Sequence, residues 1–336
     1  MIVDMRLAFI GGFGHHYLRG ALRDASTSVD RPVAVAPSGP EDDRAEEVAH
    51  RLGDARFYRD ARELFDDFKP QIVSVGATFG RNGDFAAEAL ERDIPVVSDK
   101  PVAATWQQFE RLQKAIGANS KRVLLTEFDF RSRPEFRAAR EVVRTGRIGT
   151  PVLATAQKSY RFGNRPKWYA DRSLYAGTML WIAAHAIDAI WFSTGKQLIA
   201  VTGRQGNVTR ADFGTMEDHC AALFELEGGG TGIAHADYFR PDKAKTHGDD
   251  RLRVAGSGGV VEVRDAKCVL INNDGGEQDV TNLVTTKPIH EELLAAARGE
   301  SADLYSTAAS MEIAAVLLHA RDAADKQDWR KITSSR

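Results

Sequence analysis

The feature that most constrains the fold is an alternation of strand and helix patterns through the first third of the chain. Short apolar runs rich in Val and Ile alternate with longer segments whose apolar residues recur at helical spacing. The expected strands cover 6–10, 32–36, 71–76 and 94–97, and the expected helices cover 41–52, 61–68 and 84–92. Because strands joined through helices pair in parallel, the pattern predicts an α/β Rossmann domain with a doubly wound sheet that binds ligands at its carboxyl ends.

The character of the chain changes in its second part, which is rich in strand patterns. A helix over 105–116, a strand over 122–126 and a helix over 135–145 come first. Further strands are expected over 152–160, 198–203, 221–226, 232–238, 252–255, 260–263 and 269–271, and 237–251 is expected to be a loop. Glycine turns at 228–230 and 274–276 join some of these strands at hairpin spacing. We therefore predict a Rossmann domain over 1–121 and, over 122–336, an α+β domain with a large, mostly antiparallel sheet.

Composition narrows the classes of partner. The chain has 336 residues and a formal net charge of -2, so it lacks the basic excess of a general nucleic-acid or anionic-membrane binder. Its two cysteines exclude a disulfide framework and a four-cysteine zinc site, and we expect no metal. The start of the chain lacks a signal-peptide pattern, and no run reaches the length of a membrane span. These features favour a cytoplasmic protein that acts on a small molecule.

A glycine turn directly follows the first expected strand. It comprises Gly11, Gly12, Phe13, Gly14 and His15. Leucines at helical spacing follow, so we expect a helix whose first amides, with those of the turn, face a phosphate. The fingerprint fits in two registers, starting at Gly12 or at Gly11, and we prefer the former because it places glycines where the backbone approaches a pyrophosphate. A tight turn without a ligand is the alternative.

The end of the second strand bears on the choice of cofactor. An NAD site usually has an acid there that binds the adenosine ribose, whereas this chain has Ser38 nearby and acids only from Asp42 onward. We expect Asp42 to begin the next helix and Ser38 with Arg44 to receive a 2′-phosphate, which favours NADP over NAD. An ordinary turn is equally compatible. Thr78, after the strand over 71–76, is a further cofactor candidate.

Lysine 100 stands at the end of the strand in IPVVSDKPV, between Asp99 and Pro101. Proline cannot continue a sheet ladder, so the strand ends there and presents the lysine at the carboxyl edge. The pKa of a lysine falls readily on burial, which suits this side chain to proton transfer. The alternative is a solvated lysine after a strand.

The apolar segment over 175–192 contains two titratable side chains, His185 and Asp188. Their spacing of three places both on one face of a helix. A histidine in such a helix is either a candidate acid–base group or a satisfied core residue. Three aromatic residues, Tyr160, Trp168 and Tyr238, are candidates for substrate contact, with surface roles as the alternative.

These motifs, in this order, resemble the Gfo/Idh/MocA oxidoreductase family over nearly the whole chain. The matching elements are the glycine turn, the DKP tripeptide, the GRIG turn at 146–149 and the segment GTMLWIAAHAID. The resemblance implies that Lys100 and His185 are the catalytic residues and that Asp188, the family's later acid, and Trp181 bind the substrate. It also implies a homodimer or homotetramer. The cofactor residues would be Gly11, Gly12, Phe13, Gly14, His15, Ser38, Thr78, Asp99, Lys100 and Pro101.

One position departs from the family pattern. Trp181 stands four residues before His185, where the family usually has an aspartate that binds substrate hydroxyls and tunes the histidine. An indole neither accepts those hydrogen bonds nor carries negative charge, but it can stack on a sugar face. We expect an NAD(P)-dependent oxidoreductase that exchanges a hydride with a secondary hydroxyl of a sugar, polyol or related compound. A glycoside-cleaving NAD enzyme and a dinucleotide-binding sensor or regulator are the alternatives.

Overall fold

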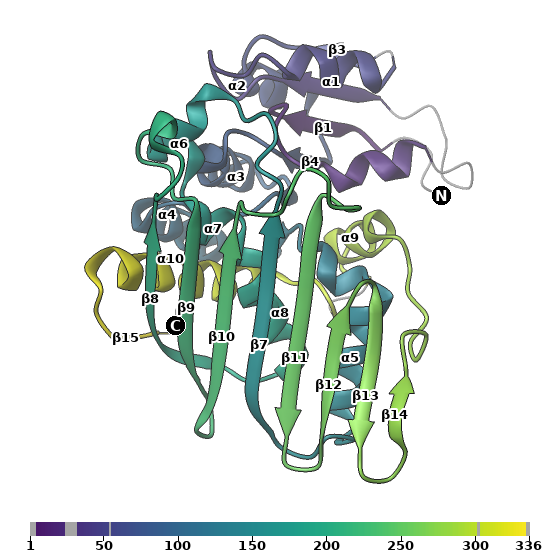
Figure 1. The fold of residues 1–336 in the computed structure, drawn as a ribbon. Helices are drawn as coiled ribbons and strands as arrows, with labels where there is room; N and C mark the ends of the chain where they lie inside the picture. Colours follow the sequence, from purple (N-terminus) through teal and green to yellow (C-terminus); the bar gives the residue numbers. More distant parts are fainter. Residues whose placement is uncertain (1–4, 24–31, 54, 301–302, 334–336) are drawn as a thin grey trace. The chain divides into compact units, whose positions relative to one another are not determined.

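The computed structural model describes residues 5–23, 32–53, 55–300 and 303–333 (Figure 1). Contacts divide the chain into two compact units. The first comprises Met1–Glu127, Ser173–Ala176 and Pro288–Ala314, and the second comprises Phe128–Arg172, Gly177–Lys287 and Ala315–Arg336. The first unit is therefore discontinuous, unlike the contiguous domains 1–121 and 122–336 that we expected from the sequence.

The first unit is built on a sheet of six parallel strands within the described residues. In chain order they are β1 (Leu7–Ile10), β2 (Val33–Ala36), β3 (Arg56–Phe57), β4 (Ile72–Val75), β5 (Val96–Ser98) and β6 (Leu124–Thr126). Their spatial order is β3-β2-β1-β4-β5-β6, so the direction of winding reverses between β1 and β4. This order confirms the predicted Rossmann domain, in which ligands bind at the carboxyl ends of the strands beside the reversal.

The helices of this unit differ from the expected ones at three places. The segment after the glycine turn is a short 3-10 helix, η1 (Tyr17–Leu22), and α1 (Ala45–Arg51) begins four residues later than expected. Near 61–68 the chain forms α2 (Ala61–Glu63) and then π-helix η2 (Leu64–Phe68). The 3-10 helix η3 (Phe79–Arg81) precedes α3 (Asn82–Glu91), and α4 (Trp106–Ala118) follows β5. These last two helices agree with the sequence pattern; α3 packs on β4 and β5, and α4 packs on α3.

The edge strand β6 is closed by residues from the far end of the chain. The backbone amide of Leu124 donates to Thr307 Oγ1 at 3.1 Å, and that of Thr126 donates to Ser310 Oγ at 3.0 Å. Both hydroxyls belong to α10 (Thr307–Lys326), and the preceding α9 (Ile289–Ala297) packs on η1. An open strand edge is a site for unwanted pairing, so these side chains protect it. Our reading of the sequence did not include either helix.

The second unit is built on a sheet of nine strands within the described residues. They are β7 (Pro151–Tyr160), β8 (Leu198–Gly206), β9 (His219–Leu226), β10 (Gly230–Asp237), β11 (Gly248–Gly256), β12 (Gly259–Arg264), β13 (Lys267–Asn272), β14 (Gly276–Asp279) and β15 (Arg330–Lys331). The order is β14-β13-β12-β11-β7-β10-β9-β8-β15, and every pair is antiparallel except β7 with β10. The predicted mostly antiparallel sheet is confirmed. The expected loop over 237–251 is shorter, because β11 already begins at Gly248 and pairs with β7.

Helices α5 (Pro134–Arg144) and α8 (Ala183–Thr194) pack on the same face of this sheet (Figure 1). Along β7 the side chains of Ala154, Ala156 and Lys158 are buried, while the intervening residues are partly exposed, as expected when one face of a sheet carries helices. The apolar segment near 175–192 forms α7 (Thr178–Trp181) and α8, preceded by α6 (Arg172–Tyr175), most of which belongs to the first unit. Three short 3-10 helices, η4 (Asp129–Ser132), η5 (Lys167–Ala170) and η6 (Ala211–Phe213), complete the unit. None of the described helices is both long and apolar enough to span a membrane.

Candidate active site

The three glycines of the turn after β1 have no room for a side chain. A Cβ on Gly11 would lie 2.4 Å from the carbonyl oxygen of Gly76, and one on Gly14 would lie 2.4 Å from the Cα of Gly76. A Cβ on Gly12 would lie 2.5 Å from Arg44. Gly11, directly after β1, also has a φ of +86°, which favours glycine. Contacts with Gly76 and Arg44 thus require glycine at these three positions.

The amides of this turn are arranged differently from our expectation. Both Phe13 and Gly14 donate their backbone amides to the carbonyl oxygen of Gly76, at 3.0 and 2.9 Å, rather than toward a phosphate. The helix that was to follow is the short η1, and its first amide, from Tyr17, donates to Glu127 Oε1 at 2.9 Å. The amides of Phe13, Gly14 and Tyr17 are thus bound within the protein, and the role of the turn in binding a phosphate stays a prediction.

The imidazole of His16 is neutral and is hydrogen-bonded to the first residue of the glycine turn. Its Nε2 lies 2.8 Å from the carbonyl oxygen of Gly11, and its Nδ1 lies 2.8 Å from Ser74 Oγ. Because a carbonyl oxygen only accepts, we assign the ring hydrogen to Nε2, and Nδ1 then accepts from the serine hydroxyl. Burial lowers the pKa of His16 to about 4, which outweighs the opposing contact with Gly11.

This lowered pKa predicts a loss of stability in mild acid. In the unfolded chain His16 binds a proton below its ordinary pKa of 6.5, whereas in the folded protein it binds one only near pH 4. The free energy of unfolding therefore falls as the pH drops from 6.5 to about 4. We expect His16 to account for a loss of about 2 kcal/mol between about pH 7 and about pH 5. Denaturant unfolding of His16→Asn should show a shallower pH dependence than the unaltered chain, and exposed His50→Asn should not. Equal slopes for His16→Asn and the unaltered chain would contradict the assignment.

Asp42 folds back onto the turn instead of beginning α1. Its Oδ2 accepts hydrogen bonds from the backbone amide of Gly12 at 3.1 Å and from the amide and hydroxyl of Ser38, both at 2.9 Å. These contacts explain the late start of α1. They also place a carboxylate where we expected Ser38 and Arg44 to receive a phosphate. The cofactor candidate Thr78 is buried and donates from Oγ1 to Glu41 at 3.3 Å.

The lysine after β5 is held in a buried loop. Lys100 has 1% of its side chain exposed. The Nδ2 of Asn82 donates to the carbonyl oxygens of Asp99, at 3.2 Å, and of Pro101, at 3.3 Å, and so fixes the loop on both sides of the lysine. A charge this deep requires a partner.

Asp99 supplies that partner and binds the glycine turn as well. Its Oδ1 accepts from Lys100 Nζ at 2.9 Å, and its Oδ2 accepts from the backbone amide of His15 at 3.0 Å. The ring Nδ1 of His15 lies 2.9 Å from the same Oδ2 and 3.0 Å from Lys100 Nζ. Burial alone would raise the pKa of Asp99, but Lys100 and His15 hold it well below the usual range.

A second buried acid, Glu127, was missed by sequence reasoning. It follows β6 as Asp99 follows β5, and it is fully buried. Burial, and secondarily the charge of Asp99, raises the pKa of Glu127 well above its usual value, although Lys100 opposes the shift. Its place after an apolar strand was the only available signal.

In the second unit, His185 has an acidic neighbour that the family pattern did not predict. Its Nδ1 lies 3.2 Å from Asp129 Oδ1, and the two side chains are 2% and 23% exposed. The rings of Phe128 and Phe130 surround the imidazole, with centroids 6.1 and 5.1 Å away. An acid from η4 therefore lies beside the histidine even though Trp181 replaces the usual one in the helix.

A charged network continues from this acid to the sheet. Arg133 Nη1 lies 4.0 Å from Asp129 Oδ2 and 2.7 Å from Asp250 Oδ2, and Lys158 Nζ lies 2.8 Å from Asp250 Oδ1. Lys158 and Asp250 are register partners on β7 and β11. The ammonium of Lys158 also lies 4.5 Å from the centroid of the Phe130 ring. Charged side chains of both signs thus extend from the neighbourhood of His185 to the sheet.

Asp188 is not available to a substrate, which corrects its assignment. It is fully buried, and its carboxylate pairs with the guanidinium of Arg131, whose Nε lies 3.2 and 3.1 Å from the two carboxylate oxygens. Burial raises the pKa of Asp188, although the charge of Arg131 opposes the shift. The pair joins η4 to α8 and so positions the segment that contains Asp129.

The other substrate candidates are spread across the second unit. Trp181 and Trp168 are 6% and 9% exposed, and Tyr238 is 1% exposed, so its ring is part of the core. Tyr160 is partly exposed at the end of β7, with its ring centroid 4.9 Å from that of His247. Of the four, Tyr160 is the one with a partly exposed side chain.

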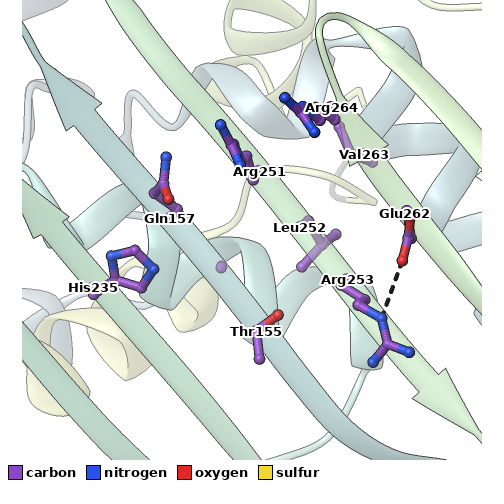
Figure 2. A pocket seen from close by; sticks show the side chains of 10 residues that line it. Thr155, Gln157, His235, Arg251, Leu252, Arg253, Glu262, Val263 and Arg264 are labelled. Carbon is purple, nitrogen blue, oxygen red and sulfur yellow. Dashed lines mark hydrogen bonds and ion pairs between the residues drawn. The ribbon is translucent and has the colours of Figure 1, made fainter. Parts of the chain in front are cut away.

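The open face of the large sheet carries a separate hollow of 290 Å³ (Figure 2). Thr155, Gln157, His235, Arg251 and Arg253 line it, among others, and Arg253 is paired with Glu262 at 3.1 Å. None of the predicted site residues lies there. The hollow is thus distinct from the histidine site on the helix-covered face.

Two family descriptions match the chain in sequence order. Residues 5–127 match an oxidoreductase family with an NAD-binding Rossmann fold, and residues 136–262 match the GFO/IDH/MocA C-terminal domain. The chain belongs to the Gfo/Idh/MocA oxidoreductase family. This membership confirms the resemblance carried by the motifs around Lys100 and His185.

Three proteins are similar to this chain in sequence or in structure. Inositol 2-dehydrogenase 2 of Saccharopolyspora erythraea is 25% identical over 211 residues, which cover 62% of this chain and 60% of that enzyme. A Thermotoga maritima structure proposed to be an oxidoreductase is 30% identical, with a TM-score of 0.91 and coverage of 98% and 100% of the two chains. Levoglucosan dehydrogenase in complex with NADH and L-sorbose is 18% identical, with a TM-score of 0.82 and coverage of 99% and 100%, and shares the fold.

Proposed function

We propose that this protein is an NAD-dependent dehydrogenase that oxidises a secondary hydroxyl of a sugar or polyol. The observation that carries the proposal is the buried Lys100 held between Asp99 and His15 at the carboxyl edge of the parallel sheet. A buried lysine bound on two sides by titratable groups is suited to proton transfer. The relatives named for inositol and levoglucosan support a polyhydroxylated substrate.

The residues of the first unit fit a dinucleotide. The glycine turn excludes side chains where the pyrophosphate would approach the backbone, and Asp42 supplies an acid beside the turn. When bound, the nicotinamide would accept the hydride. Lys100 would then take or return the hydroxyl proton. The cofactor set from Gly11 to Pro101 and the roles of Lys100 and His185 in one reaction rest on the family resemblance.

Asp129 compensates for the aspartate that Trp181 replaces. Its carboxylate lies 3.2 Å from His185 Nδ1 and would stabilise the imidazole when it is protonated. His185 would share the proton transfer with Lys100, and Trp181 would contribute an apolar wall. In this proposal His185 keeps an aspartate beside it, but the aspartate comes from η4 instead of from the helix that contains Trp181.

The activity is tested with a panel of sugars and polyols in the presence of NAD. We expect absorbance from free NADH with at least one member, and a loss of about 10²-fold or more in kcat for His185→Asn. Asp129→Asn should also lower kcat, because a protonated His185 loses its charged neighbour. Exposed His50→Asn is the matched control. Glycoside cleavage without net NADH, or cofactor binding without any turnover, would replace the proposal by the corresponding alternative.

The cofactor is NAD rather than NADP in this proposal. The Ser38 hydroxyl donates to the Asp42 carboxylate, so the group that we expected to receive a 2′-phosphate lies beside a negative charge. A phosphate there would be repelled, whereas ribose hydroxyls can donate to the acid. The preference for NADP drawn from the sequence is therefore replaced.

Removal of this carboxylate should change the cofactor preference. Asp42→Ser is expected to raise the KM for NAD about 10-fold and to lower that for NADP, because one charge-assisted hydrogen bond is lost and one repulsion is removed. Titration of NADH and NADPH by fluorescence gives the same comparison without turnover. Exposed Asp43→Ser is the matched control. An unchanged ratio of the two affinities in Asp42→Ser would count against this assignment.

We also propose a homodimer or homotetramer, as the family resemblance implies. Val152, Leu223 and Ile271 are large apolar residues on strands of the nine-stranded sheet and are 53%, 39% and 37% exposed. Such residues favour association through this sheet. Sedimentation of the purified protein tests the proposal, and a monomer at micromolar concentration would exclude it.

A further inference from the structure

His15 gives the buried lysine a contact that the glycine turn does not require. Its imidazole Nδ1 lies 3.0 Å from Lys100 Nζ, while the His15 side chain is 35% exposed and that of Lys100 is 1% exposed. The histidine is thus in contact with the lysine and also reaches the surface of its unit. The ring stacks on Tyr17 in parallel, at an interplanar angle of 5° and a centroid distance of 5.4 Å, which fixes its orientation.

Asp99 supports the proton on either of these two groups. Its Oδ1 lies 2.9 Å from Lys100 Nζ and its Oδ2 lies 2.9 Å from His15 Nδ1, so one carboxylate contacts both nitrogens. With the proton on the lysine, the ammonium donates to Oδ1, and Nδ1 can accept from the ammonium. With the proton on the histidine, Nδ1–H donates to Oδ2 and the lysine is a neutral amine. The anion is within hydrogen-bonding distance of the cation in both states.

This arrangement addresses a difficulty in the use of Lys100 as a base. The Lys100 side chain is 1% exposed, so it has almost no surface through which to exchange a proton with water. A partner that is both a neighbour of the amine and exposed removes this obstacle. His15 makes such a contact with Lys100 from a side chain that is 35% exposed.

We propose that His15 is a relay residue that transfers the proton between Lys100 and solvent. The inference rests on the proposed dehydrogenase function. During oxidation, the hydride leaves the substrate carbon for NAD and the hydroxyl proton forms an N–H bond on the Lys100 amine. The ammonium then gives a proton to His15 Nδ1, and Nε2–H releases a proton to water. The ring is left as the other neutral tautomer and returns through exchange with water, so each cycle yields one NADH and one proton.

The test is chemical rescue of a variant that lacks the imidazole. We expect His15→Ala to lower kcat about 10²-fold near neutral pH, and free imidazole in the buffer to raise the residual rate about 10-fold in a saturable manner. His15→Gln retains a polar side chain that cannot shuttle a proton, so it should be as slow as His15→Ala. NADH fluorescence titration and thermal unfolding establish that both variants bind cofactor and fold. Exposed His50→Ala should keep its rate and should not respond to imidazole.

A readout without turnover separates this inference from the proposed function. In protein labelled with ¹⁵N in its histidine rings, Lys100→Met should change the Nδ1 resonance of His15 and leave that of His50 unchanged. Full kcat in His15→Ala without imidazole, in an enzyme that oxidises a polyol, would overturn the relay and leave the dehydrogenase intact. Absence of turnover in the unaltered protein would instead refute the proposed function. An unchanged His15 resonance in Lys100→Met would then refute the contact on which the relay depends.

Discussion

Replacement of Lys100 by methionine is expected to lower kcat about 10²- to 10⁴-fold, the range that removal of a general acid or base usually costs. Methionine approximates the shape of the side chain and fills the buried site beside Asn82 and Asp99, but it carries no proton. Asp99 keeps its contacts with the amide and ring of His15, so the carboxylate is not left without partners. The loss should therefore appear in turnover more than in folding.

Lys100→Arg distinguishes charge from proton transfer. A guanidinium keeps the positive charge beside Asp99 but stays protonated at any pH that the protein survives, so it should be nearly as slow as methionine. Exposed Lys114→Met is the matched control and should retain the rate. The measurements are steady-state kinetics with the best substrate of the panel and thermal unfolding of each variant. More than a tenth of the rate in Lys100→Met would exclude Lys100 as the proton-transferring residue.

The second large effect is expected on stability, from Arg131→Met. The guanidinium of Arg131 is 5.2 Å from the ring centroid of Phe128 and 5.1 Å from that of Trp191, and it pairs with fully buried Asp188. Removal of one partner leaves a buried carboxyl group without its cation, which typically costs about 3–5 kcal/mol. Unfolding in denaturant should show this loss as a lower midpoint.

A double replacement tests whether the loss of stability comes from Asp188 being buried without its cation. Arg131→Met with Asp188→Leu removes both charges and should recover a large part of the stability, because apolar groups of similar size can replace a buried ion pair. Arg144→Met, which breaks the exposed pair with Glu141, is the control and should change the midpoint little. Equal stability of Arg131→Met and the unaltered protein would show that the pair is dispensable.

The fold was predictable where periodicity alone determines the structure. The Val- and Ile-rich runs became β1, β2, β4 and β5, and alternating patterns became the large antiparallel sheet. The starts and ends of helices were less predictable, because tertiary contacts set them. Asp42 reads as a helix start, yet its carboxylate accepts hydrogen bonds from Ser38, four residues away, and from the amide of Gly12, 30 residues away.

The site was predictable to the extent that motifs specify positions along the chain. Lys100 and His185 come from such motifs, and their catalytic roles remain predictions. The partners could not be read in advance, because His15 meets Lys100 across 85 residues and Arg131 meets Asp188 across 57. Asp129 belongs to the same class: nothing in the helix around Trp181 indicates that an acid from η4 lies beside the histidine. Contacts of this kind depend on the packing of distant segments.

The closure of β6 by Thr307 and Ser310 has a consequence for the order in which the protein is made. The strands of the parallel sheet all leave the ribosome before residue 127, but the hydroxyls that satisfy the edge amides of Leu124 and Thr126 belong to residues synthesised about 180 positions later. Throughout that interval the edge is open to pairing with another nascent chain. Synthesis of the first unit thus begins first but is completed only after most of the second unit has been translated. The time needed to translate the second unit therefore sets how long the edge of β6 stays open to misassembly.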